Sequence, residues 1–275
     1  MNDLVVHFID ADCGNMTLVL FPNGATYLYD CNATDGNKGA ILAYLRKAMG
    51  GRKRIDIFIC SHRDADHMRG LRKIHNAYPI SEIRDPDVPG TTIDSPEYCD
   101  YMALRREIGS RTIEARTKLE VGNATVRYMN AADDDLFDAN DQSVVMKVEY
   151  AGSAVLLAGD TSFRPWKEGI LPFYSDEKLR ADILLGSHHG SLTFFDDPSD
   201  EKNYYTAHIK KIAPAMTLLS VGSNVWDLPD DKALELYTRY SSGSNNGNKV
   251  FRTDEKGNMK LILKSGGGWS LYVNQ

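Results

Sequence analysis

The sequence predicts an α/β protein in which helices cover the outer faces of two packed β-sheets. Short β-branched and apolar runs cluster in each half of the chain, and helical patterns lie between them. The composition, 42% hydrophobic and 25% charged over 275 residues, suits a chain that buries a sizeable core. We therefore expect a four-layer αββα sandwich built as a single domain over residues 1–275.

The first half of the chain alternates predicted strands with predicted helices. The strand-like runs lie at 4–9, 16–21, 25–30 and 55–60. The helical patterns lie at 38–49, from about 66 to 74, and at 95–108. Around that last helix, residues 80–116 are predicted to form an irregular, insertion-like segment.

The second half contains more predicted strands than helices. The strand-like runs lie at 118–121, 124–129, 143–150, 153–160, 181–187, 216–222, 248–253, 259–264 and 268–273. Helical patterns lie at 199–213 and 230–240. Strands gathered in each half, with helices between them, predict a layered sandwich with two sheets inside and helices outside.

The bulk properties exclude some classes of protein. With 32 basic and 38 acidic residues the net charge is −6, which argues against a protein that coats DNA irrespective of sequence. A nuclease stays compatible with this charge, because acidic metal ligands count toward it. No apolar run is long enough to cross a membrane, and the N-terminus lacks the pattern of a signal peptide. The four cysteines lack CxxC spacing and are expected to be reduced thiols in a cytoplasmic protein: Cys13, Cys31, Cys60 and Cys99.

The segment "SHRDADHMRG" (61–70) concentrates metal-ligating residue types directly after the predicted strand 55–60. His62 and Asp64 are two residues apart on an extended segment, so their side chains can project to one side. Asp66 and His67 follow at the predicted helix start and can face a second point nearby. This arrangement suits two metal ions. The alternative is a capped helix start with surface charges, since Asp is a common N-cap residue.

Two further strand ends carry similar residues. The run 153–160 ends in Asp160, where a lone buried carboxylate would be costly without a partner. The run 181–187 leads into His188, His189, Gly190 and Ser191. Three strand ends with metal-ligating residues in one chain favour a metal-dependent hydrolase with a dinuclear centre.

The order of these motifs, HxDxDH, then GD, then HHGS, resembles the metallo-β-lactamase fold. It is similar in particular to the branch found as the nuclease domain of the DNA-uptake protein ComEC and in its stand-alone relatives. Four other segments carry the same resemblance: "VHFIDADCGNMTLVLFPNGATYLYDCN" with Asp10, Gly14 and Asp30, "NDQSVVMKVEYAGSAVLLAGD", "LLSVGSNVWDLPDD" and "VFRTDEKGNMKL".

The resemblance implies an αββα sandwich with two divalent metal ions, Zn²⁺ or Mn²⁺, at one edge between the sheets. The implied metal ligands are His62, Asp64, Asp66, His67, the bridging Asp160, one of His188 and His189, and Asp141 as a ligand or an outer contact. The implied catalytic residues are Asp66, His188, His189 and Ser191. Two departures from the family pattern stand out: Asp12 replaces an early glycine, and Leu228 replaces a histidine before Pro229.

The leading functional hypothesis is a phosphodiesterase or nuclease that acts on nucleic acid or nucleotides through a water shared by two metal ions. A basic stretch at 45–54, together with Arg69, Arg72 and Lys73, could guide a phosphate backbone, although solvated helix faces explain the same residues. The alternatives are hydrolysis of a small ester, lactone or thioester, and a non-catalytic domain that binds a partner. Fold alone does not choose among them.

Overall fold

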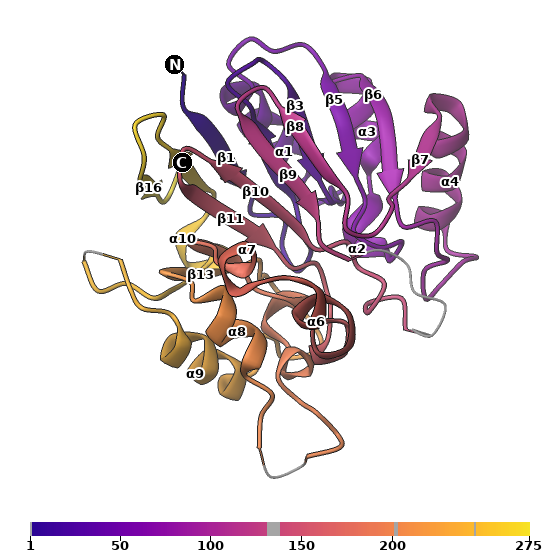
Figure 1. Ribbon diagram of the computed structural model, residues 1–275. Coiled ribbons are helices and arrows are strands. Elements are labelled where there is room, and N and C mark those ends of the chain that lie inside the picture. The colour runs from indigo at the N-terminus through magenta and orange to yellow at the C-terminus, as the bar shows by residue number, and fades with distance from the viewer. Residues whose placement is uncertain (1, 131–137, 201–202, 245) are drawn as a thin grey trace.

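The computed structural model describes residues 2–130, 138–200, 203–244 and 246–275. Two β-sheets pack face to face, and helices cover the outer face of each sheet (Figure 1). The predicted four-layer αββα sandwich is therefore confirmed.

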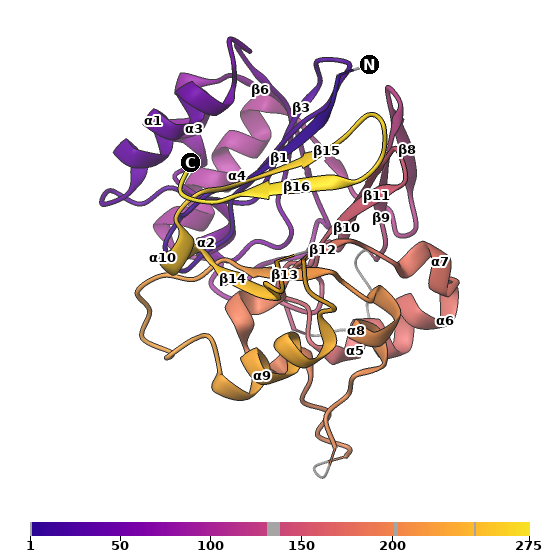
Figure 2. The ribbon, with the colours of Figure 1, turned by 90° about the vertical axis from the view of Figure 1, so that its left-hand side faces the viewer.

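The first sheet has eight strands from both ends of the chain. Their order across the sheet is β16 (Trp269–Tyr272), β15 (Met259–Leu263), β1 (Leu4–Phe8), β2 (Thr17–Leu20), β3 (Thr26–Tyr29), β5 (Ile55–Ile59), β6 (Ile80–Asp85) and β7 (Ser110–Thr112). Strands β3, β5, β6 and β7 run parallel, and the other neighbours are antiparallel. Figure 2 shows the terminal strands β1, β15 and β16 side by side.

The second sheet has seven strands, all between residues 118 and 252. Their order is β14 (Val250–Arg252), β13 (Met216–Leu219), β12 (Ile183–Leu185), β11 (Ser153–Leu157), β10 (Met146–Tyr150), β9 (Ala124–Tyr128) and β8 (Lys118–Val121). Strands β11 to β14 are parallel, so their carboxyl ends meet at one edge. The two-residue strand β4 (Cys31–Asn32) lies outside both sheets and forms isolated β-bridges with Met68 and Arg69.

Three apolar layers hold the sandwich together. Alternate strand residues such as Val6, Ile57, Val148 and Leu185 meet between the sheets. The other face of the first sheet packs against α1 (Lys38–Ala48), α3 (Leu71–Ala77) and α4 (Pro96–Ile108). The other face of the second sheet packs against η1 (Trp166–Ile170), η3 (Leu192–Phe194), α8 (Ala207–Ile212) and α9 (Asp231–Tyr240). Central strands buried on both faces explain why their sequences are continuous apolar runs.

Several elements differ from the expectation. The helix expected at about 66–74 is two helices, α2 (Ala65–Met68) and α3, because Gly70 takes a left-handed conformation with φ 71° between them. The segment 80–116 is less irregular than expected, since β6 and β7 extend the first sheet and α4 packs on it. The helix expected at 199–213 is limited in the described residues to α8.

The short helices after β11 and at the end of the chain were not predicted. They are α5 (Phe163–Pro165), η1, α6 (Leu171–Phe173), α7 (Asp176–Leu179), η2 (His188–Gly190), η3 and α10 (Thr253–Lys256). Most span three to five residues, which is too short to produce a readable helical period. Within the described ranges, no helix combines the length and apolarity that crossing a membrane requires. The four cysteines are free thiols.

Candidate metal centre

Polar side chains from both sheets meet at the edge where the parallel strands end. From the first sheet, Asp30 follows β3, and His62 lies just past β5. From the second, Asp160 follows β11 and His189 follows β12. In open α/β sheets, ligands bind in the crevice outside the carboxyl ends of the parallel strands. The strand order thus brings together side chains that lie far apart in the sequence.

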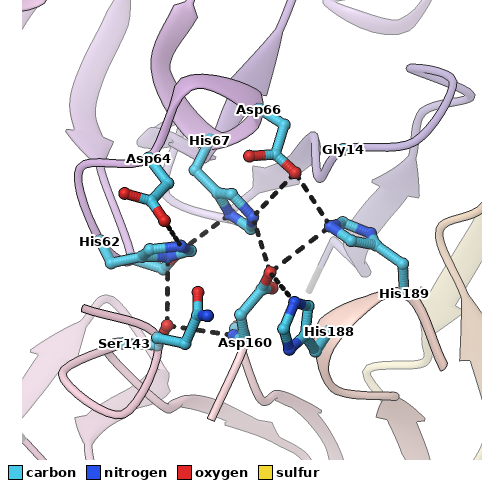
Figure 3. A network of polar contacts seen from close by, with 12 residues as sticks. Gly14, His62, Asp64, Asp66, His67, Ser143, Asp160, His188 and His189 are labelled. Carbon is cyan, nitrogen blue, oxygen red and sulfur yellow. Dashed lines mark hydrogen bonds and ion pairs between the residues drawn. The ribbon is translucent and has the colours of Figure 1, made fainter. Parts of the chain in front are cut away.

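Four side chains form the centre of this site: Asp66, His67, Asp160 and His189. One ligand atom from each lies within 4.8 Å of the corresponding atom of every other. Figure 3 shows Asp160 in the middle, with its Oδ2 3.1 Å from Nε2 of His67 and 3.5 Å from Nε2 of His189. The carboxylate of Asp66 closes the group, 3.3 Å from Nε2 of His189. Two carboxylates and two imidazoles facing one point are a donor set for a divalent cation.

The histidines are held by one ring nitrogen and present the other to the centre. His67 donates from Nδ1 to the buried carboxylate of Asp30 at 2.8 Å. His189 donates from Nδ1 to the carbonyl oxygen of Ser220 at 2.9 Å. Such contacts fix the tautomer and leave Nε2 as the ligand atom, as in most histidines that bind metals.

His62 has the same arrangement. Its Nδ1 lies 3.1 Å from Oγ of Ser61 and 3.1 Å from Oγ of Ser143. Its Nε2 is buried without a hydrogen-bond partner. The serine contacts therefore orient this ring as Asp30 and Ser220 orient the other two.

The buried polar atoms test whether a cation fits. Among the described residues, the buried side-chain atoms without a hydrogen-bond partner include Nε2 of His62, Oδ1 of Asp160 and Nε2 of His189. An unsatisfied buried polar atom is costly, and three in one place need a common explanation. Divalent cations bound at this edge supply one, because they would coordinate these three atoms. The residues present therefore fit a metal centre.

The charges of the metal-free centre support the same conclusion. Burial lowers the pKa of His67, but the carboxylates of Asp160, Asp30 and Asp66 outweigh it and raise that pKa well above the usual value. Burial also lowers the pKa of His189, but the carboxylates of Asp160 and Asp66 outweigh it and raise that pKa well above the usual value. Burial raises the pKa of Asp160, but His67 and His189 overcome it and hold it well below the usual range. The carboxylates thus attract positive charge, which protons supply when no metal does.

Two predicted ligands lie beside this cluster of four. Oδ2 of Asp64 is 3.8 Å from Nε2 of His62. Both carboxylate oxygens of Asp64 also accept hydrogen bonds from Thr91: Oδ1 from the backbone N–H at 2.6 Å and Oδ2 from the hydroxyl at 2.8 Å. His188 is more exposed than His189, with 27% of its side chain accessible, and its Nε2 lies 3.9 Å from Oδ2 of Asp160. Both histidines have left-handed backbone, with φ 49° and 54°, which turns their rings in different directions.

Two other predicted site residues have different partners. Asp141 is not one of the four clustered residues, and its Oδ1 accepts the backbone N–H of Ser162 at 2.9 Å. Ser191 caps η3, where its Oγ accepts the backbone N–H of Thr193 at 3.3 Å. The structure therefore shows these two side chains engaged in shaping the loops around the site.

The two departures from the family pattern lie in loops next to the site. The carboxylate of Asp12 accepts a hydrogen bond from Nδ2 of Asn37 at 2.9 Å. Leu228 precedes Pro229, and a Cβ on Gly190 would lie 2.5 Å from Cβ of Pro229. Asp230 accepts the backbone N–H of Leu192 at 2.6 Å. This segment therefore packs directly against the histidine loop.

The basic residues considered as a guide for phosphate lie elsewhere or are paired. Arg52 and Arg54 precede β5, whereas His62 follows its other end, so the stretch 45–54 lies at the opposite end of that strand from the centre. Arg69 and Arg72 pair with carboxylates on α4, and Lys73 pairs with Asp35. Ion pairs with neighbouring carboxylates therefore explain the positions of Arg69, Arg72 and Lys73.

Residues that orient the histidines were not assigned a role from the sequence. Asp30 was noted only as part of the opening motif, yet it is fully buried and accepts hydrogen bonds from Ser61 N and Oγ at 2.6 and 2.9 Å as well as from His67. One sequence signal was present, because Asp30 ends an apolar strand as Asp160 does. Ser220 also follows an apolar strand, but it acts through its backbone carbonyl, and the contact of Ser143 with His62 depends on how the sheets pack.

The fold and the metal-binding cluster define a metal-dependent hydrolase class. A sequence model described as the metallo-beta-lactamase superfamily matches residues 10–193, about two thirds of the chain. The protein belongs to this superfamily. The predicted resemblance is therefore confirmed.

Two curated relatives place the chain near the ComEC-type branch. It is 24% identical over 270 residues to "Competence protein ComA" of Neisseria gonorrhoeae, which covers 97% of this chain and 33% of the relative. It is 26% identical over 243 residues to "Recombination protein 2" of Haemophilus influenzae, which covers 88% of this chain and 27% of the relative. The chain therefore spans about a third or less of the length of these relatives.

Solved structures show the same fold at low sequence identity. The metallo-beta-lactamase fold protein YhfI from Bacillus subtilis has a TM-score of 0.52 and 13% identity, covering 98% of this chain and 100% of that one. CmlA, a diiron beta-hydroxylase from Streptomyces venezuelae, has a TM-score of 0.54 and 14% identity, covering 96% of this chain and 54% of that one. A hydroxylase among these neighbours illustrates that the fold does not fix the reaction.

Proposed function

We propose that the protein is a metal-dependent phosphodiesterase that cleaves nucleic acid or nucleotides. The observation that carries the proposal is the cluster of Asp66, His67, Asp160 and His189, in a chain that is similar along 97% of its length to part of a competence protein. A second relative named for recombination adds support for a nucleic-acid substrate.

In this proposal each of these residues has a part in holding metal. Asp66, His67, His189 and Oδ2 of Asp160 would hold one divalent cation. His62, Asp64 and the unpartnered Oδ1 of Asp160 would hold a second. Asp141 would have an indirect part, through the backbone it fixes at Ser162. A mixed set of carboxylates and imidazoles suits both Zn²⁺ and Mn²⁺.

Cations bound there would supply Lewis-acid polarisation of a phosphate oxygen and activation of the attacking water. The protein's own contribution is to exclude bulk water around the buried imidazoles and to fix the ligand tautomers through Asp30 and Ser220. His188 is the group best placed to donate a hydrogen bond to a substrate oxygen. It is accessible, and its Nδ1 is 3.3 Å from the hydroxyl of Thr193, while His189 faces the metal.

A substrate panel tests the proposal. We expect Mn²⁺- or Zn²⁺-loaded protein to hydrolyse single-stranded DNA, RNA or bis-p-nitrophenyl phosphate faster than a lactone or a thioester. Exhaustive chelation should abolish this activity, and His189→Ala should abolish it with loss of bound metal. Phe173→Ala is the matched control, because Phe173 is an exposed apolar side chain on α6 outside the cluster.

Each alternative has its own signature in the same panel. Robust lactone or thioester hydrolysis without phosphodiester cleavage would identify a small-ester hydrolase instead. Stoichiometric metal with no hydrolysis of any substrate would favour a non-catalytic binding domain. Full activity after chelation would refute the metal-dependent mechanism itself.

A further inference from the structure

Three exposed apolar side chains lie on two loops that contact segments of the metal centre. Among the large hydrophobic residues of the described chain, Val225 is 89% exposed, Trp226 is 71% exposed and Ile93 is 59% exposed. Val225 and Trp226 lie between β13 and α9, and Ile93 lies between β6 and α4. Exposing an indole to this extent forgoes much of the free energy its burial would contribute, so its position calls for a functional explanation.

The loop that carries Trp226 is anchored at both ends to the histidine segment. Before the loop, the carbonyl of Ser220 accepts from Nδ1 of His189 at 2.9 Å. After it, the backbone N–H of Asp230 donates to the carbonyl of Gly190 at 3.1 Å. Trp226 therefore lies on a connection whose two ends are bonded to the predicted ligand His189 and to the next residue, Gly190.

The same loop is braced internally by one side chain. Oδ1 of Asn224 accepts the backbone N–H groups of Trp226 at 3.1 Å and Leu228 at 2.9 Å. Its Nδ2 donates to the carbonyls of Gly222 at 3.0 Å and Leu228 at 2.9 Å. This network holds the tip in a defined shape while the indole stays outside it. A preorganised aromatic surface is a low-entropy contact for a ligand.

The second loop touches the other half of the site. Thr91 donates twice to Asp64, and a Cβ on Gly90 would lie 2.0 Å from the carbonyl oxygen of Arg63. Ile93 follows two residues after Thr91. Each loop thus has one apolar tip and one direct contact with a predicted metal-binding segment.

The charges of the two loops indicate what such tips can bind. Residues 86–95 and 221–230 contain neither Lys nor Arg, and their charged side chains are all aspartates. These tips are therefore unsuited to phosphate groups or to an anionic lipid surface. An aromatic face without cations suits a nucleobase, which stacks irrespective of its identity.

We propose that Trp226, with its neighbour Val225, forms an apolar rim that binds unpaired nucleobases next to the phosphodiester held at the metal centre. This inference rests on the proposed phosphodiesterase function and makes single-stranded nucleic acid the substrate class. In a duplex, the bases stack on one another and their faces are not available to the indole.

Comparing the cleavage kinetics of an oligonucleotide with those of a strand that lacks its bases tests the rim. The substrates are a ten-nucleotide oligothymidylate and an abasic oligonucleotide with the same number of phosphates. For the wild-type protein we expect a KM about tenfold lower for oligothymidylate, within the range that base–aromatic stacking produces. Trp226→Ala should remove that difference with kcat nearly unchanged. Trp226→Phe should restore most of it, and the control Phe173→Ala should leave it intact.

Equilibrium binding separates failure of the rim from failure of the proposed function. The fluorescence of Trp226 is obtained as the difference between the emission of wild type and of Trp226→Phe. Its quenching on addition of an oligonucleotide measures binding without catalytic turnover. Quenching by oligothymidylate but not by the abasic strand would support the rim even if no substrate were cleaved. Equal cleavage of both strands by wild type and Trp226→Ala would overturn the rim and leave the phosphodiesterase standing. A change from dimer to monomer in Trp226→Ala, seen by light scattering, would assign the tip to a second copy and overturn the inference.

Discussion

Asp30→Asn provides a sharp test of how the metal centre is held. Asp30 is not one of the four clustered ligands. Its carboxylate accepts hydrogen bonds from Ser61 and from Nδ1 of His67, so it orients a ligand without being one. Asparagine has the same shape but only one acceptor oxygen, so its amide NH₂ must face one of these donors. The substitution therefore perturbs the orientation of His67 without removing a proposed ligand.

The expected magnitudes follow from this contact set. Leaving one buried donor without an acceptor costs about 1–3 kcal/mol of unfolding free energy. Loss of the partner that fixes a ligand histidine costs about 10- to 100-fold in metal affinity. At saturating metal, kcat should fall much less, because the residues that face the substrate are unchanged.

Two measurements check this prediction. Metal affinity is measured by competition with a chromophoric chelator, and the free energy of unfolding by urea denaturation of the metal-free protein. Asp56→Asn is the matched control: its carboxylate accepts the backbone N–H of Thr26 at 2.8 Å near the opposite end of β5. It should lose stability without a comparable loss of metal affinity. Wild-type metal affinity in Asp30→Asn would refute the proposed orientation of His67.

Three other predictions concern the ligands and the response to acid. His189→Ala should lose bound metal, whereas His188→Ala should keep it and lose about 100-fold in kcat; equal metal loss in both would contradict this assignment. Asp160→Asn should lower metal affinity on the order of 100-fold and Asp64→Asn about tenfold, because Asp160 is proposed to hold both cations and Asp64 only one. A larger loss in Asp64→Asn than in Asp160→Asn would contradict this role of Asp160. Burial lowers the pKa of His208 to about 3, so the fold holds it neutral while the unfolded chain takes up a proton below about pH 6.5. The contribution of His208 to the unfolding free energy should therefore fall by about 1.4 kcal/mol per pH unit as the pH drops from 6.5 toward 3. In urea denaturation, the unfolding free energy of His208→Gln should depend less steeply on pH than that of the wild type.

The sequence predicted the layers and the ends of the strands better than the details of the site. Apolar runs followed by Asp160 or by the histidine pair were readable, because strand burial and a polar strand end each leave a local pattern. The contact of Asp64 with Thr91 was not readable, because it depends on how the loop after β6 folds back. The separation of His188 from His189 likewise depends on two consecutive left-handed residues that no periodicity reveals.

Helical content shows the same limit. The helix around Ile41 and Leu45 has a clear apolar face and was predicted. The turns between Phe163 and Leu179 were missed, because each is shorter than the pattern needed to recognise it. Tertiary packing around Trp166, which is fully buried, holds them in place instead.

The division of the ligands between the two sheets has a consequence for how the protein matures. Asp66 and His67 follow β5 of the first sheet, and Asp160 and His189 follow β11 and β12 of the second, so no short local segment contains the clustered donor set. In small zinc modules a local ligand set lets the metal drive folding. Here the two sheets must pair first, a slow process dominated by contacts distant in sequence. Metal bound per chain therefore measures the fraction of molecules in which both halves have assembled correctly.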